Sequence, residues 1–201
     1  MMVTILVASL CSFLLGSVPF GVLVARTKGV NILEVGSGNI GATNVWRALG
    51  PGPGSVVFIL DFAKGLAPAL YGLIALQAPH LGLLLGIVAV IGHSFSPWIG
   101  FKGGKGVATG FGAILGAVPI VAAITLGTFL IVLGTTRYVS LASILASGAM
   151  ITSAWLSPLP MEAQIALSLL GAWVIFRHRA NIGRLMNGTE NKFGRKKENA
   201  G

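Results

Sequence analysis

Hydrophobic residues occupy most of the chain in six long stretches, which cover residues 2–25, 53–77, 80–100, 107–135, 138–157 and 161–176. Short segments rich in glycine, proline and serine separate these stretches. A helix needs about 20 mostly apolar residues to cross a hydrocarbon core of roughly 30 Å. The pattern therefore predicts an all-α integral membrane protein whose spanning helices are joined by short loops.

The fourth stretch, residues 107–135, is too long for one upright span, because as a single helix it would reach about 43 Å. Pro119 lies near its middle. One interpretation is a single tilted span. The other is a pair of short helices of about 13 residues each, which fold back near Pro119.

The distribution of positive charge favours the fold-back. The chain has 14 Lys and Arg residues against 5 Asp and Glu residues, and cytoplasmic loops of membrane proteins carry an excess of Lys and Arg. With two helices, every basic residue except Lys64 lies on one side of the membrane. Those residues then fall in the loops 26–52, 101–106 and 136–139 and in the tail 177–201. We therefore predict a seven-transmembrane-helix bundle with the N-terminus outside and the C-terminus in the cytoplasm.

The composition leaves little room for a soluble domain, since 54% of the residues are apolar and only 9% are charged. We expect a single membrane-embedded domain over residues 1–201, with a polar, partly disordered cytoplasmic tail over residues 188–201. The sequence pI of about 10.5 would suit a nucleic-acid-binding protein. The positive-inside distribution accounts for these charges instead, so we expect no nucleic acid partner.

The first basic loop combines glycines with phosphate-binding side chains in residues 36–47. Glycines allow backbone N–H groups to turn toward a ligand, and a helix that begins near Gly41 would direct its positive end the same way. Thr43, Asn44 and Arg47 would share one face of that helix. The alternative is an interfacial helix anchored by its tryptophan and arginine.

The second basic loop places two lysines around paired glycines in residues 102–105. Successive N–H groups and an ammonium group can form an anion-binding concavity there. The alternative is a tight turn with two ordinary positive-inside lysines. The Gly-x-x-x-x-Gly-Lys-Ser/Thr spacing of a nucleotide-binding P-loop is absent, and we interpret the nearby His93 as a structural hydrogen-bonding residue.

A third polar segment follows the last apolar stretch. His178 and Asn181 are spaced to share a helical face, and Arg177 with Arg184 would continue a neighbouring stripe. A basic flank that stops membrane insertion would explain the arginines. It would not require His178 or Asn181.

Asp61 and Lys64 lie within the second apolar stretch at i, i+3 spacing. Ionisable groups at membrane depth are costly enough to require a partner or a function, and we interpret these two as a structural ion pair. No pair among the five acidic residues resembles a metal site. We expect neither a metal nor an organic cofactor.

The polar segments resemble the motifs of the PlsY family, bacterial membrane acyltransferases that make lysophosphatidic acid from acyl phosphate and glycerol 3-phosphate. The matching segments are residues 36–47, 92–93 with 101–106, 137–144 and 178–190. The resemblance spans nearly the whole chain and implies a seven-helix bundle in the bacterial inner membrane, with its site facing the cytoplasm. It also implies membrane lipid as a partner and a role in phospholipid synthesis. The oligomeric state is left open, and a monomer is compatible with the sequence.

The resemblance also implies roles for individual residues. Catalysis would involve Ser37, Arg47, His178 and Asn181. Substrate and phosphate binding would involve Gly36, Gly38, Thr43, Asn44, Lys102, Gly103, Gly104, Lys105, Ser140 and Ser143. Glu190 would support its motif structurally.

These roles suit direct acyl transfer, in which the sn-1 hydroxyl of glycerol 3-phosphate attacks the acyl phosphate carbonyl and phosphate leaves. Either His178 or a substrate phosphate would accept the proton, and the surrounding arginines favour the substrate. The alternative function is a membrane transporter or channel for phosphate or a phosphorylated metabolite. A transporter should expose polar elements near the membrane midplane, whereas the polar residues here gather at one side.

Overall fold

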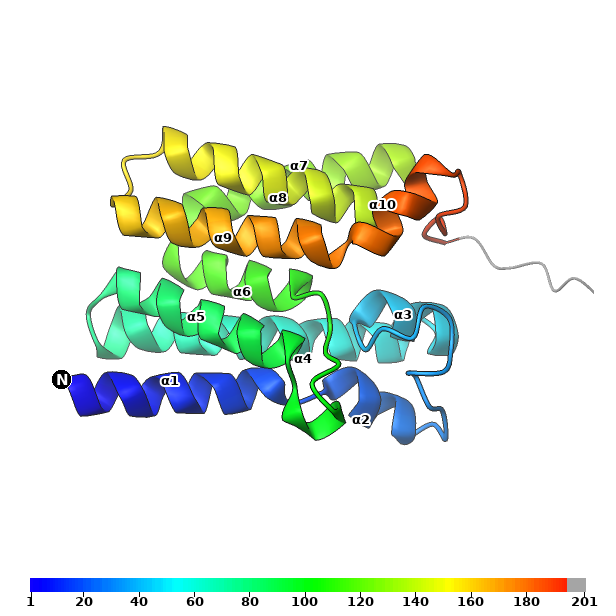
Figure 1. Ribbon diagram of the computed structural model, residues 1–201, viewed down its shortest axis with the longest axis horizontal. Coiled ribbons are helices and arrows are strands. Elements are labelled where there is room, and N and C mark those ends of the chain that lie inside the picture. Colours follow the sequence, from blue (N-terminus) through cyan, green and yellow to red (C-terminus); the bar gives the residue numbers. More distant parts are fainter. Residues whose placement is uncertain (195–201) are drawn as a thin grey trace, which may run out of the picture. The chain divides into compact units, whose positions relative to one another are not determined.

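Helices are the only regular secondary structure in residues 1–194, the part that the computed structural model describes (Figure 1). The predicted polar tail begins at residue 188, and its last part, residues 195–201, lies outside the described residues. The chain forms two compact units, Met1–Ala122 and Ala123–Gly201. The elements in chain order are α1 (Met2–Ser17), α2 (Phe20–Arg26), α3 (Ala42–Leu49), α4 (Pro51–Leu70), η1 (Tyr71–Ala75), α5 (Pro79–Ser94), η2 (Pro97–Ile99), α6 (Val107–Ala117), α7 (Pro119–Thr136), α8 (Val139–Leu156), α9 (Met161–Arg177) and α10 (Arg179–Met186).

Among residues 1–194, five helical segments are long and apolar enough to cross a membrane. They are Met2–Arg26, Pro51–Ala75, Pro79–Ile99, Pro119–Thr136 and Val139–Leu156. The other two predicted spans correspond to shorter helices, α6 with 11 residues and α9 with 17 residues. The all-helical class is confirmed for the described residues, while the count of seven spans and the orientation of the termini stay predictions.

The predicted break at Pro119 is confirmed, because α6 ends at Ala117 and α7 begins at Pro119. Proline suits the first position of a helix, where its missing N–H has no partner to lose. The two helices are nevertheless unequal, with 11 residues in α6 and 18 in α7. The expected length of about 13 residues was therefore wrong for α7, because all residues from Pro119 to Thr136 are helical.

The first apolar stretch is also divided, which the sequence analysis did not predict. α1 ends at Ser17, and α2 begins at Phe20 after Pro19. Val18 adopts ψ 118 in place of a helical value, because the ring of a proline disfavours helical backbone in the residue before it. The break leaves carbonyl groups in the middle of an apolar segment, and these need hydrogen-bond donors from elsewhere.

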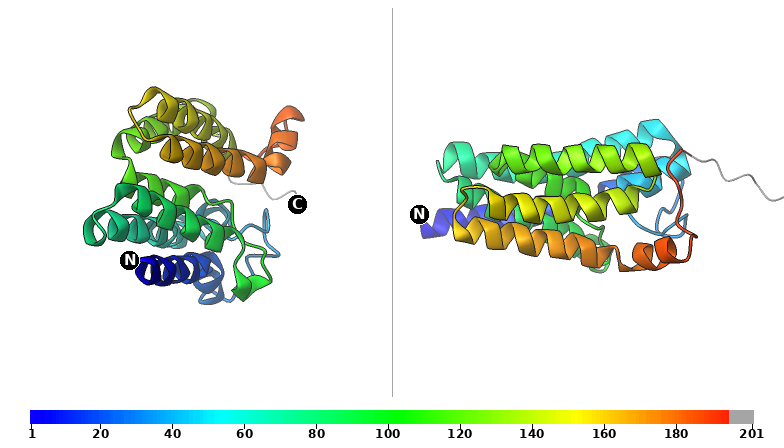
Figure 2. Two further views of the ribbon diagram at one scale, coloured as in Figure 1. Left: turned by 60° about the vertical axis from the view of Figure 1, so that its left-hand side comes forward. Right: turned by 90° about the horizontal axis from the view of Figure 1, so that it is seen from above.

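The first unit packs α1, α4, α5 and α6 side by side (Figures 1 and 2). Glycines make this close approach possible. A Cβ atom on Gly65 would overlap the carbonyl of Thr109, and one on Gly16 would overlap the backbone of Ala89. Small residues at helix contacts are typical of membrane bundles, where backbone proximity provides the packing energy.

The second unit is built around the packing of α8 against α9 (Figure 2). Ala146 and Met150 on α8 and Leu167 and Leu170 on α9 are buried. A hydrogen bond from the Trp155 indole to the Ser168 hydroxyl also joins the two helices. α10 follows α9 after a break at His178 and contacts both α8 and α9.

Candidate functional site

In the first unit, the loop before α3 is organised by one buried side chain, Asn44, which is 3% exposed. Its Nδ2 group lies 3.3 Å from the carbonyl oxygen of Ile32, 3.0 Å from that of Val35 and 2.9 Å from that of Asn39. Its Oδ1 atom accepts a hydrogen bond of 3.0 Å from the Ser37 N–H. The predicted phosphate-binding amide of Asn44 is therefore directed to the loop backbone in this structure.

Hydrophobic contacts anchor both ends of the same loop. Ile32 and Ile40 are buried in a cluster with α2, α3 and α4, while Gly36 and Ser37 between them are exposed. Gly36 has φ +64, and a Cβ there would overlap Asn44 Oδ1. The fold thus presents a short exposed turn on a fixed base.

α3 begins at Ala42 with Gly41 as its N-cap, as predicted. Arg47 is exposed and Thr43 is half-buried. Together with the exposed turn at Gly36 and Ser37, these residues give the first unit a hydroxyl and a guanidinium group that suit an anion.

The N–H groups of Gly103 and Gly104, which were predicted to bind phosphate, are hydrogen-bonded to backbone carbonyls in this structure, and their part in substrate binding stays a prediction. The N–H of Gly103 donates to the Ser94 carbonyl at 3.2 Å, and the N–H of Gly104 donates to the His93 carbonyl at 3.1 Å. These bonds dock the loop on the end of α5. Lys102 is exposed and Lys105 is half-buried, so side chains provide the positive charge of this loop.

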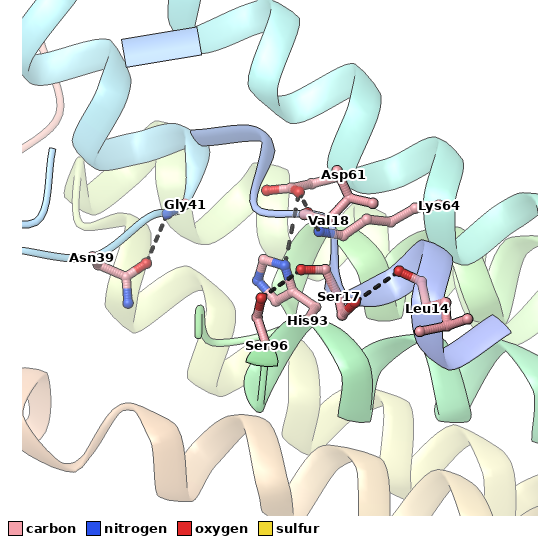
Figure 3. A network of polar contacts seen from close by, with 9 residues as sticks. All are labelled: Leu14, Ser17, Val18, Asn39, Gly41, Asp61, Lys64, His93 and Ser96. Atoms are coloured by element: carbon pink, nitrogen blue, oxygen red, sulfur yellow. Dashed lines mark hydrogen bonds and ion pairs between the residues drawn. The ribbon is translucent and has the colours of Figure 1, made fainter. Parts of the chain in front are cut away.

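Asp61 and Lys64 form the predicted ion pair, with 2.7 Å between Lys64 Nζ and the carboxylate (Figure 3). Both side chains are almost completely buried. Lys64 Nζ also donates to the Val18 carbonyl at 2.9 Å, and His93 Nδ1 lies 3.7 Å from the Asp61 carboxylate. The pair therefore connects α4 to the α1–α2 break and to the end of α5.

A second carbonyl at that break, the carbonyl of Ser17, also receives a hydrogen bond from outside its helix. The Ser96 hydroxyl donates to the Ser17 carbonyl at 2.6 Å, as Figure 3 shows, and the Trp98 indole donates to the Ser17 hydroxyl at 2.8 Å. The break in the first span is thus stabilised by polar groups that come from α4 and from the segment after α5.

In the second unit, Glu190 accepts hydrogen bonds from three separate positions. The Ser140 hydroxyl lies 3.1 Å and Asn181 Nδ2 2.9 Å from Oε1, and Arg184 Nε lies 2.7 Å from Oε2. The carboxylate therefore joins α8, α10 and the segment after α10. The structural role expected for Glu190 agrees with these contacts.

Burial of Glu190 disfavours its ionised form. The hydrogen bonds from Arg184, Asn181 and Ser140, together with the charge of Arg184, outweigh that effect, and the pKa of Glu190 lies below its ordinary value. The carboxylate is ionised at neutral pH.

Two of the predicted site residues in this unit, Ser140 and Asn181, are thus directed to Glu190. A third, Ser143, donates its hydroxyl to the Val139 carbonyl at 2.8 Å. Sequence reasoning did not find Arg184 as the partner of Glu190. Gly188, which has φ +67, lies between the two residues and indicates a turn that can bring them together.

His178 lies at the break between α9 and α10, with Asn181 in the first turn of α10. The predicted stripe from Arg177 to Arg184 is interrupted, because these arginines belong to different helices. His178 Nδ1 lies 2.7 Å from the Val174 carbonyl. A carbonyl only accepts, so Nδ1 carries the proton, and any proton that the neutral ring accepts goes to Nε2.

Within residues 1–194, no three His, Cys, Asp or Glu side chains gather as a metal site would require. The polar side chains described above are hydroxyl, amide, imidazole, carboxylate and cationic groups.

Comparison with known proteins shows what this chain is similar to. A family profile described as glycerol-3-phosphate acyltransferase matches residues 6–188. A glycerol-3-phosphate acyltransferase of Acholeplasma laidlawii is 42% identical, with 96% of this chain and 94% of the relative covered. One from Aquifex aeolicus is 44% identical, with 90% and 95% covered.

Two solved structures have the same fold. The crystal structure of PlsY described as the glycerol 3-phosphate form of an integral membrane glycerol 3-phosphate acyltransferase has a TM-score of 0.89 and 41% identity, with 95% of this chain and 96% of the other covered. The lysophosphatidic acid form has a TM-score of 0.86 and 40% identity, with the same coverage. The family profile includes every candidate catalytic and substrate-binding residue named above.

Proposed function

Because this chain belongs to the PlsY family of glycerol-3-phosphate acyltransferases, it is an integral membrane acyltransferase, and we propose that it transfers a fatty acyl group from acyl phosphate to the sn-1 hydroxyl of glycerol 3-phosphate. The products are lysophosphatidic acid and inorganic phosphate, in the first acylation step of phospholipid synthesis. The observation that carries the proposal is the similarity to the glycerol 3-phosphate form of PlsY, with a TM-score of 0.89 at 41% identity.

Arg47, Lys105 and Lys102 supply the positive charge for two phosphate groups in this proposal. The exposed Arg47 guanidinium can bind phosphate oxygens in a bidentate way, and the ammonium groups act as point charges. Ser37 and Thr43 add hydroxyl donors. Asn44 and the two glycines of the second loop act by holding these loops in place, since their polar groups are bound to the backbone.

The proton of the attacking hydroxyl has two possible acceptors, His178 Nε2 and a phosphate group of a bound substrate. We favour the phosphate, because Arg177 and Arg179 flank His178 in the chain and disfavour its protonated form. His178→Gln should then retain most of kcat. A loss of kcat with an unchanged KM for both substrates would instead identify His178 as the base.

For the topology we propose seven membrane spans in the bacterial inner membrane, with the N-terminus outside and the substrate-binding loops in the cytoplasm. The asymmetry of Lys and Arg supports this arrangement. Two variants test this arrangement in intact cells. Each carries Cys11→Ser and one new cysteine, which is either Lys102→Cys or Ser157→Cys. Labelling by a membrane-impermeant maleimide at position 157 and not at position 102 is expected, and the reverse pattern would overturn the orientation.

The reaction is tested by phosphate release from acyl phosphate with the purified protein in detergent. Release should depend strictly on added glycerol 3-phosphate, and lysophosphatidic acid should appear in equal amount. Liposome uptake of phosphate without acyl transfer would favour a transporter. Arg47→Ala and Lys105→Ala should each lower kcat/KM for glycerol 3-phosphate by about 100-fold, whereas Lys28→Ala, an exposed basic residue of the first loop, serves as the control.

A further inference from the structure

We propose that His93, held by the Asp61–Lys64 pair, is a positioning residue for glycerol 3-phosphate. It holds the loop 102–106, and with it Lys105, in the conformation that binds the substrate phosphate. This inference rests on the proposed function. It assigns a purpose to the buried ionic groups of the first unit, which the acyl-transfer reaction does not use.

The contact between His93 and the loop is direct. His93 is 3% exposed, and its carbonyl accepts the Gly104 N–H at 3.1 Å. Gly104 also lies against the imidazole so closely that a Cβ there would overlap Nε2. The next carbonyl, that of Ser94, accepts the Gly103 N–H at 3.2 Å. The residues immediately before Lys105 are therefore shaped to the ring and the backbone of His93.

The imidazole in turn depends on α4. Its Nδ1 atom lies 3.7 Å from the Asp61 carboxylate, which is too long for a hydrogen bond but places the ring directly beside a buried charged group. Asp61 is paired with Lys64 at 2.7 Å, and Lys64 is bound to the Val18 carbonyl at 2.9 Å (Figure 3). Buried contacts thus run from the break in the first span to the loop that carries Lys105.

Stability alone does not account for these charges. A buried ion pair is often replaceable by hydrophobic residues of similar volume with no loss of stability. The pair nevertheless has two additional contacts outside α4, one at Val18 and one at His93. The pair therefore positions the segments at Val18 and His93, and this role explains why charged side chains are present where apolar ones would also fill the space.

The kinetic consequence is specific to one substrate. If the network positions Lys105, its loss weakens binding of glycerol 3-phosphate, and the KM for acyl phosphate changes little. We expect His93→Ala to raise the KM for glycerol 3-phosphate by about tenfold, with kcat within about threefold of the parent. His93→Asn, whose amide keeps a polar group beside Asp61, should recover part of that loss.

The controls separate positioning from a general loss of structure. His80→Gln removes an exposed histidine from the first turn of the same helix, α5, and should leave both KM values unchanged. Ile114→Ala leaves a cavity at a fully buried apolar residue of α6 and should lower the melting temperature. Its lower melting temperature should not be accompanied by a selective change in the KM for glycerol 3-phosphate.

The decisive variant is the double substitution Asp61→Leu with Lys64→Met, because it removes both charges and leaves no buried charge unpaired. We expect a melting temperature above that of Asp61→Asn and below that of the parent, because the Val18 carbonyl loses its Lys64 donor, together with a raised KM for glycerol 3-phosphate. A parent-like KM in this variant would overturn the proposal, as would parallel changes in both KM values in His93→Ala. If the parent protein itself shows no glycerol 3-phosphate-dependent release of phosphate, the proposed function fails before the variants are compared.

Discussion

Asp61 and Glu190 are both buried carboxylates that organise their surroundings, but they do so in different ways. Asp61 has its cation one helical turn away on α4, so the charge pair forms within a single element. Glu190 takes its donors from Ser140, Asn181 and Arg184, of which Ser140 is distant in the sequence. The first carboxylate is neutralised locally, whereas the second is satisfied only when separate elements have come together.

The difference follows from where each group lies. Asp61 is inside an apolar helix, where an unpaired charge would be very costly and a cation at i, i+3 is the nearest solution. Glu190 follows α10, beyond the candidate membrane spans, and its hydrogen bonds define the path of the chain. The local Asp61–Lys64 pair therefore lowers the cost of burying charge in a span, whereas the hydrogen bonds of Glu190 hold separate segments together.

The largest expected effect is the loss of one member of the local pair. Asp61→Asn leaves Lys64 buried without its countercharge and should lower the free energy of unfolding by about 3–5 kcal/mol. Thermal unfolding in detergent, followed by fluorescence, measures this change. The double variant Asp61→Leu with Lys64→Met should regain part of it, because no buried charge is left unpaired although the Val18 carbonyl loses its donor. No recovery would mean that the pair is not a local unit.

Glu190→Gln should cost about 2–3 kcal/mol, since it removes the charge that Arg184 binds and weakens two further hydrogen bonds. Glu162→Gln, in the exposed first turn of α9, is the matched control and should be nearly neutral. Removing the Arg184 charge together with the Glu190 charge should not restore the stability of the protein. A double Glu190→Leu, Arg184→Leu variant still leaves Ser140 and Asn181 without an acceptor, so full recovery would contradict the long-range role.

Gly36→Ala should cost about 1–2 kcal/mol and reduce activity, because it combines a positive φ with an overlap on Asn44 Oδ1. Gly29→Ala is the matched control, with φ +70 and no atom within 4 Å of the added Cβ. The difference between the two melting temperatures isolates the contact with Asn44. Equal losses would show that only the backbone conformation matters.

The smallest expected effect is the pH dependence due to Glu190. Its pKa is lower in the folded protein than the ordinary value of 4.5, so the folded state binds fewer protons at this site than the unfolded state. The stabilisation is therefore present above about pH 4.5 and is lost as the pH falls through the folded pKa. The free energies of unfolding of the parent and of Glu190→Gln should therefore converge at pH values below the folded pKa of Glu190. A difference that stays constant with pH would contradict the lowered pKa.

Several features could be predicted because their causes are local. The break at Pro119, the start of α3 after Gly41 and the Asp61–Lys64 pair each depend on residues within one or two helical turns. The break at Pro19 was equally visible in the sequence and was missed. Continuous hydrophobicity was given more weight there than the restriction that proline imposes on the residue before it.

The sequence predicted which residues belong to the candidate site better than it predicted what their polar groups contact. Asn44 and the N–H groups of Gly103 and Gly104 were expected to face a ligand, but they bind the backbone of their own loops and of α5. Amide and N–H groups suit either purpose. Which one they serve depends on the path of the neighbouring chain, and a linear motif does not contain that information.

The sequence by itself determined that this is a helical membrane protein, where its basic residues lie and to which family its motifs are similar. Hydrophobic length, charge asymmetry and proline position act over short distances, so they can be read from the chain. Only the tertiary structure decided that Lys64 binds the Val18 carbonyl, that His93 supports the second loop and that Glu190 collects donors from two helices. Those contacts join residues far apart in the chain, and the packing of helices through small residues sets which of them meet.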